Sequence, residues 1–76
     1  MSKYHFLRTF RRVTGLTPYQ FILMLRMRRA AVRLATSADP VAHVAYDAGF
    51  GDLSTFNNRF RGLFGAPPTK FRASAA

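Results

Sequence analysis

Several residue types are missing from this 76-residue sequence or are rare in it: it has no cysteine, no tryptophan and no glutamate, and only 3 aspartates. Without cysteine, disulfides and thiolate metal sites are excluded. Two histidines and three aspartates also offer little for acid–base catalysis, so we expect neither an enzyme nor a metal or cofactor site. No apolar run reaches the length of about 18 residues that a membrane-spanning helix needs, and the start, MSKYHFLRTFRR, lacks the features of a signal peptide. The sequence therefore predicts a cytoplasmic protein.

Positive charge, in contrast, is in large excess. Lys and Arg together number 12, so the net charge is +9 at pH 7 and the pI is about 11.7. Such a charge indicates a polyanionic partner, either nucleic acid or an anionic membrane surface. A chain this short buries only about 60% of its unfolded surface, so its fold must rest on local packing or gain stability from a partner.

Glycines and prolines divide the sequence into stretches with helical periodicity, and no stretch alternates with period two for long enough to predict a strand. The sequence thus predicts an all-α fold. The expected helices cover roughly 2–13, 18–36, 40–48, 52–63 and 68–72, and residues 73–76 are expected to form a frayed tail. Between the third and fourth helices lies Gly49-Phe50-Gly51, where Gly49 can adopt the left-handed conformation that ends a helix. This is the helix-turn-helix layout.

The three acidic residues are explained locally. Asp52 is placed to cap the fourth helix, and Asp39, like Thr17, precedes a proline as an N-cap residue would. The remaining aspartate, Asp47, lies four residues after His43, and we expect these two to pair on a helix surface.

An internal repeat appears when the sequence is shifted by fifty residues. Six identities fall within sixteen positions, at Phe6/Phe56, Phe10/Phe60, Arg11/Arg61, Gly15/Gly65, Pro18/Pro68 and Phe21/Phe71. The shared pattern predicts a helix with an apolar stripe, a glycine at its end, and a proline-started helix whose phenylalanine returns to the core. The chain therefore carries the same supersecondary unit twice.

Each repeated helix has one apolar and one polar face. The phenylalanines are at core spacing, with Leu7 and Leu53 towards the same side. The opposite faces carry Tyr4, His5, Arg8, Arg11 and Arg12 in the first helix, and Ser54, Thr55, Asn58 and Arg61 in the second. These are side chains that suit base edges and phosphates, so we interpret both faces as binding surfaces.

The long helix over 18–36 has apolar stripes on two nearly opposite sides, so it is expected to have neighbours on both. A membrane-surface helix would have one broad apolar face instead. At 1.5 Å per residue the helix spans roughly 28 Å, not far below the ~34 Å between successive major-groove faces of DNA.

Residues 41–72, VAHVAYDAGFGDLSTFNNRFRGLFGAPPTKFR, resemble the signature of the AraC/XylS family of bacterial transcription regulators. The shared pattern has A-x4-GF at the turn, F-x3-FR in the following helix, and then G-x2-P-x2-[FY]-R. Residues 2–34 are similar to the family's first recognition helix and the linker helix after it. The resemblance covers all but the tail. It implies a homeodomain-like fold of two helix-turn-helix units, which insert two recognition helices into successive major grooves.

The resemblance also implies roles for individual residues. The family's base-reading positions fall on Tyr4, Leu7, Arg8, Leu53, Ser54, Thr55 and Asn58. We expect phosphate contacts from Lys3, Arg11, Arg12, Arg59, Arg61 and Lys70. Double-stranded DNA is thus the expected partner, at the nucleoid, with RNA polymerase and a second copy of the chain as further candidates.

The family's domain has a supporting helix ahead of its first recognition helix, and this sequence begins at the recognition helix itself. We therefore interpret it as a fragment of a regulator: 2–16 as a partial first unit, 17–37 as the linker helix, 38–72 as a complete second unit, and 73–76 as a tail. Phe6 and Phe10 are then expected to have lost part of their cover. Two alternatives stay open, a cationic membrane-surface protein and a non-functional remnant of a regulator.

Overall fold

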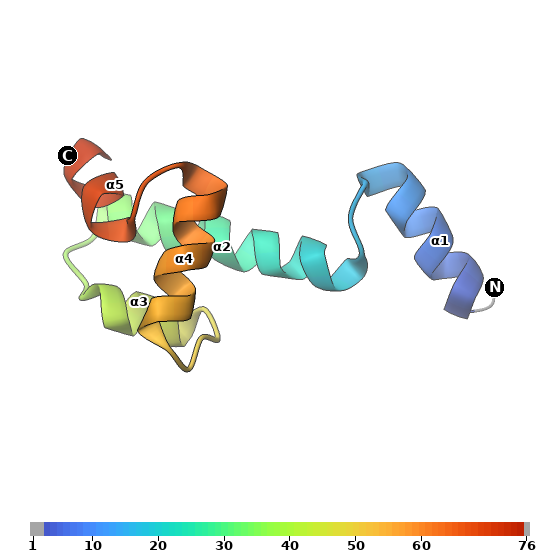
Figure 1. Ribbon diagram of the computed structural model, residues 1–76, viewed down its shortest axis with the longest axis horizontal. Coiled ribbons are helices and arrows are strands. Elements are labelled where there is room, and N and C mark those ends of the chain that lie inside the picture. The colour runs from blue at the N-terminus through green and yellow to red at the C-terminus, as the bar shows by residue number, and fades with distance from the viewer. Residues whose placement is uncertain (1–2, 76) are drawn as a thin grey trace.

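The computed structural model describes the backbone of residues 3–75 and the side chains of residues 5–75, and all regular structure in this range is helical. The helices are α1 (Lys3–Thr14), α2 (Pro18–Thr36), α3 (Val41–Asp47), α4 (Leu53–Phe64) and α5 (Pro68–Ala75). Figure 1 shows α3, α4 and α5 gathered around one part of α2, while α1 stands apart beyond the other end. The all-α prediction is confirmed, and the molecule is elongated, with extents of 45 × 23 × 19 Å.

Two of the predicted helix starts are confirmed in detail. Thr17 accepts a hydrogen bond from the Gln20 backbone N–H at 3.2 Å, and the Gln20 side chain accepts one from the Thr17 N–H at 3.0 Å, which together form a capping box. Asp52 accepts from the backbone N–H groups of Ser54 and Thr55, at 3.3 and 3.2 Å. Gly49 has the expected left-handed φ of 95°.

The predicted roles of Asp39 and Asp47 are wrong. Helix α3 begins one residue later than expected, with Pro40 at the N-cap position and no side-chain cap. The carboxylate of Asp39 instead accepts a hydrogen bond from Arg33 Nε at 2.8 Å, and Asp47 pairs with Nη1 of the same guanidinium rather than with His43. Both carboxylates bind Arg33 because its planar fork presents several donors from the last turn of α2.

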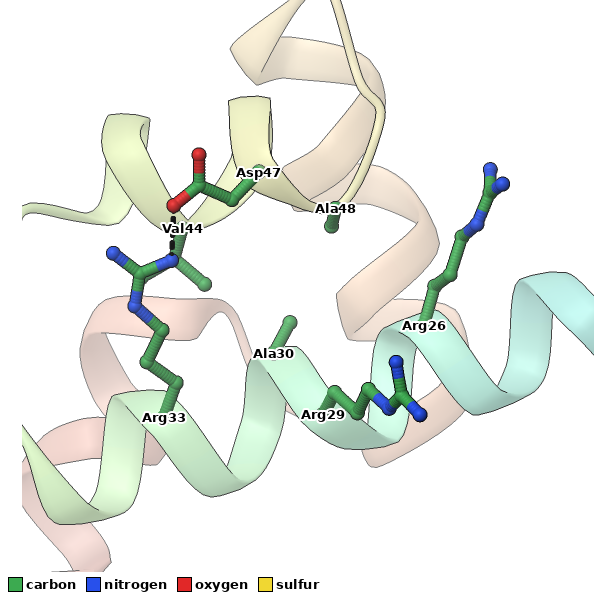
Figure 2. A pocket seen from close by; sticks show the side chains of 7 residues that line it. All are labelled: Arg26, Arg29, Ala30, Arg33, Val44, Asp47 and Ala48. Carbon is green, nitrogen blue, oxygen red and sulfur yellow. Dashed lines mark hydrogen bonds and ion pairs between the residues drawn. The ribbon is translucent and has the colours of Figure 1, made fainter.

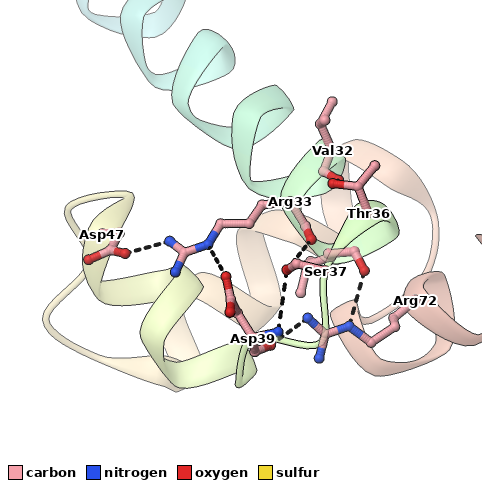
Figure 3. A network of polar contacts seen from close by, with 8 residues as sticks. Val32, Arg33, Thr36, Ser37, Asp39, Asp47 and Arg72 are labelled. Atoms are coloured by element: carbon pink, nitrogen blue, oxygen red, sulfur yellow. Dashed lines mark hydrogen bonds and ion pairs between the residues drawn. The ribbon is translucent and has the colours of Figure 1, made fainter.

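This polar network joins three helices (Figure 3). Arg33, at the end of α2, binds Asp39 in the following loop and Asp47 at the end of α3. Arg72 of α5 donates from Nε to the Leu34 carbonyl at 3.1 Å and from Nη2 to the Asp39 carbonyl. The loop between α2 and α3 is therefore held from both sides.

Helix α5 reaches Ala75, so the expectation that the chain frays from residue 73 is wrong for residues 73–75. No glycine or proline follows Arg72, and alanine has the highest intrinsic helix propensity. The helix therefore continues beyond the last residue that packs against the core.

The hydrophobic core lies around the C-terminal half of α2. Its buried residues are Met27, Ala30, Ala31, Leu34, Val44, Ala45, Phe56 and Phe60. The ring of Phe60 lies edge-on to that of Phe71, with centroids 5.2 Å apart, and Phe56 packs in the same way on Phe50 at 5.4 Å. This core fixes how α4 is turned relative to α2 and α3.

The two copies of the repeat differ in burial. Phe56 is fully buried, whereas its counterpart Phe6 is 51% exposed. Phe10 is half-buried and makes an edge contact with Phe21 at 5.5 Å. The phenylalanines of the first unit are therefore less covered than those of the second.

The expectation of neighbours on both sides of α2 is confirmed only near the start of the helix, within the part of the chain that the structure describes. Phe21 is covered by Phe10, but Leu25 and Val32 are 40% and 62% exposed. Helix α1 reaches this side only near the start of α2, whereas α3 and α5 pack on the other side, where Met27 and Leu34 are buried.

Acid is expected to destabilise this fold, because two carboxylates lose favourable contacts on protonation. The hydrogen bond from Arg33 lowers the pKa of Asp39 below its ordinary value of 3.8. The hydroxyl of Thr55, followed by the backbone N–H groups of Thr55 and Ser54, lowers the pKa of Asp52. Because both native pKa values lie below the unfolded ones, the stabilisation is complete above about pH 5 and is lost as the pH falls through the native pKa values.

Urea denaturation followed by circular dichroism, from about pH 6 to pH 2, measures this loss. The double variant Asp39→Asn, Asp52→Asn should be less stable than the unmodified chain at neutral pH and should lose less stability on acidification. An unchanged pH dependence in the double variant would contradict the assignment.

Candidate nucleic-acid interface

The outer face of α4 presents three polar side chains together. The cap at Asp52 fixes the first turn, and the buried Phe56 fixes the rotation of the helix. Ser54, Thr55 and Asn58 are therefore exposed on the side away from the core. Their backbone is rigidly placed by local hydrogen bonds and packing, as a surface that reads another molecule requires.

The hydroxyl of Thr55 is partly committed. It donates to Asp52 Oδ2 at 2.8 Å, so its proton is not available to a ligand, while its oxygen can still accept and its methyl group can make apolar contact. Asn58 makes no hydrogen bond through its side chain to any described residue, so its amide can both donate and accept.

Helix α1 presents a more strongly basic face. Arg8, Arg11 and Arg12 are all exposed, and Arg8 stands at the repeat position that Asn58 occupies in α4. The side chains of Lys3 and Tyr4 lie outside the described residues, so their assigned roles stay predictions.

Leu7 and Leu53, which are expected towards the core side, are each 36% exposed. Leu7 borders an open hollow between α1 and the start of α2, together with Arg8 and Tyr19. Leu53 is the first residue of α4 and precedes the part of the helix that packs on α3. Their exposure leaves both free to make apolar contacts with a partner.

The predicted phosphate-binding residues whose side chains are described, all except Lys3, are exposed but not gathered in one place. Arg61 shares α4 with Asn58, and Arg11 and Arg12 share α1 with Arg8. Arg59 turns towards α2 and borders a hollow there with Tyr19, Leu23 and Arg26 among others. Lys70 is on α5, which lies by the C-terminal end of α4 and so at the far end from Ser54 (Figure 1).

Almost all of the positive charge is uncompensated. Among the lysines and arginines within residues 5–75, Arg33 is the one that forms an ion pair, and it binds two of the three carboxylates. The third, Asp52, is engaged as a helix cap. The two exposed faces are therefore cationic overall, which favours a polyanion.

Helix α2 sets the distance between these faces. It has 19 residues, which at 1.5 Å per residue is about 28 Å.

No helix among residues 3–75 is both long enough and apolar enough to cross a membrane.

Comparison with known proteins matches residues 1–74 to the family described as "Helix-turn-helix domain". The multiple antibiotic resistance protein MarA of Escherichia coli strain K12 is 34% identical over 71 residues, 93% of this chain and 56% of MarA. The HTH-type transcriptional activator RhaS of Escherichia fergusonii is 41% identical over 59 residues, 78% of this chain and 21% of RhaS. The chain thus spans about half or less of these relatives.

Among solved structures, the chain is similar to the DNA-binding domain of AdpA, a global transcriptional factor, in a crystal structure with a target DNA. The TM-score is 0.84 and the identity 35%, and the match covers 97% of this chain and 67% of that one. The likeness extends over both units and the helix between them.

Proposed function

Because the chain belongs to the helix-turn-helix family of the AraC/XylS type, we propose that it binds double-stranded DNA sequence-specifically, as a domain of a transcription regulator. Helices α1 and α4 enter successive major grooves, and α2 spaces them. The observation that carries this proposal is the exposed set Ser54, Thr55 and Asn58, on a helix whose rotation is fixed by the buried Phe56 and Phe60. The similarity to the AdpA domain, solved with a target DNA, supports it.

The bases are read by side chains whose hydrogen-bond donors and acceptors match those on the base edges. Arg8 suits guanine, to which a guanidinium donates twice, and Asn58 suits adenine, with which an amide exchanges a donor and an acceptor. Ser54 and the acceptor oxygen of Thr55 add single hydrogen bonds. Leu7 and Leu53 contribute contacts with thymine methyl groups, and the base-reading role of Tyr4 is part of the same proposal.

Phosphate contacts hold the domain in register and carry no sequence information. Arg11 and Arg12 anchor α1, and Arg61 anchors α4. Further contacts come from Lys3, Arg59 and Lys70. In this role the protein is not an enzyme, acts at the nucleoid in the cytoplasm, and has RNA polymerase and a second copy of itself as candidate partners.

Selection of bound duplexes from a random pool is the direct test. A common sequence with elements about one helical turn apart is the expected result. For the selected duplex, log K against log salt concentration should fall with a slope near −5, because about six phosphates are neutralised at −0.9 each. Fluorescence anisotropy over a salt series measures the slope.

Other outcomes point to the rival functions. Helicity induced by anionic lipid vesicles but not by duplex DNA would favour a membrane-surface protein. A chain that neither unfolds cooperatively nor selects any duplex would favour a non-functional remnant. Either result would overturn the proposal.

A further inference from the structure

A small hollow lies between α2 and α3, beside the turn that leads to α4. Its volume is about 200 Å³. Figure 2 shows Arg33 and Asp47 at one end of the hollow and Arg26 and Arg29 at the other, with Ala48 close by. Sequence analysis did not identify this group, because its members come from two helices that only the tertiary fold brings together.

The two ends of the hollow differ in charge balance. Arg33 is held by Asp39 and Asp47, so its guanidinium already has its counter-charge. Arg26 and Arg29 form no ion pair with any described residue. Two guanidinium groups therefore border the same hollow without an anion.

Arg26 lies beside the glycine of the turn. A Cβ atom at Gly49 would come within 3.2 Å of Arg26 Nη1. The guanidinium thus lies against the backbone of this turn, in space that a side chain at position 49 would restrict. The same glycine that ends α3 leaves room for the arginine.

Capping of α3 does not explain the two arginines. The last carbonyls of α3 already accept hydrogen bonds from backbone N–H groups: those of Val44, Ala45 and Tyr46 bind the N–H groups of Ala48, Phe50 and Gly49, at 3.0, 3.0 and 2.9 Å. Arg26 and Arg29 make no hydrogen bond with these oxygens and keep their donors free. Their arrangement therefore favours a ligand from outside the chain.

We propose that this hollow binds a phosphate group through Arg26 and Arg29. The planar donor fork of arginine matches the geometry of phosphate oxygens, and a charged acceptor strengthens each hydrogen bond. The volume is below the range of about 300–1,000 Å³ of sites for drug-sized ligands, so a small oxyanion fits better than a large molecule. The phosphate belongs either to the DNA backbone, in which case the site rests on the proposed function, or to a free phosphorylated molecule.

The first arm of the test uses inorganic phosphate without DNA. Phosphate is titrated into the protein against sodium chloride at equal ionic strength, and the amide signals of Ala48 and Gly49 are followed by NMR. The double variant Arg26→Gln, Arg29→Gln should bind phosphate at least tenfold more weakly. Arg28→Gln is the matched control, because Arg28 is on the same helix but does not border this hollow.

The second arm measures binding to the selected duplex over a salt series. If the phosphate belongs to DNA, the double variant should reduce the salt slope by about two, roughly one for each phosphate contact, while Arg28→Gln leaves it nearly unchanged. If it belongs to a free molecule, the double variant loses phosphate binding but keeps the slope. Thermal unfolding of each variant verifies that the fold is intact.

The site is refuted if the double variant matches the control in both arms. If the unmodified chain selects no duplex, the proposed function is refuted instead. The titration with inorganic phosphate then tests the phosphate site without DNA.

Discussion

Replacing Phe56 with alanine is expected to lower the free energy of unfolding by about 3–5 kcal/mol, the cost of truncating a buried phenylalanine in a packed core. Phe56 is fully buried, and its ring packs against Phe50 and Phe60 at centroid distances of 5.4 and 5.8 Å. At roughly 0.05–0.15 kcal/mol per residue, a chain of 76 residues has a total stability of about 4–11 kcal/mol, so this loss is a large share of it. Urea denaturation followed by far-ultraviolet circular dichroism measures the change.

The repeat supplies a matched control for this prediction. Phe6 stands fifty residues before Phe56 in the same pattern, yet it is 51% exposed. Phe6→Ala should therefore cost only about 1 kcal/mol or less, since little apolar area is newly exposed. Similar losses in the two variants would contradict the difference in burial between the first and second units.

Replacing Asn58 with alanine is expected to weaken binding to the selected duplex by about 1–3 kcal/mol, roughly five- to 150-fold, with little change on unrelated duplexes. The amide of Asn58 is exposed and free of intramolecular hydrogen bonds within the described residues, so it can pair with an adenine edge. Arg8→Ala should have a similar effect at a guanine in the other half of the site. Competition binding with selected and scrambled duplexes measures both.

Arg61→Ala serves as the control for Asn58→Ala. Arg61 is exposed on the same helix and is proposed to contact phosphate. Its loss should weaken binding to all sequences about equally and reduce the salt slope by about one. If Asn58→Ala also weakened all sequences equally, base reading by this residue would be refuted.

The confirmed features of the fold depend on interactions between residues close in sequence. The caps at Thr17 and Asp52 use partners within three residues, and the left-handed Gly49 reflects the conformational freedom of glycine itself. Helical periodicity likewise identified Phe56 and Phe60 as core residues.

The errors arose where a distant residue competed with a near one. Asp39 was expected to cap a helix and Asp47 to pair with His43, but both bind Arg33, which is 6 and 14 residues away from them. Local pattern could not anticipate this, because a guanidinium with several donors outcompetes a single backbone N–H or an imidazole for an exposed carboxylate.

The sequence by itself determined the helical composition, the repeat and the polar faces of α1 and α4, since these follow from periodicity and from glycine and proline positions. Only the tertiary structure decided which copy of the repeat is buried, which residue neutralises the carboxylates, and that Arg26 lies beside the turn at Gly49. The physical reason is that burial and charge pairing depend on which helices pack together, and that packing joins residues far apart in the chain.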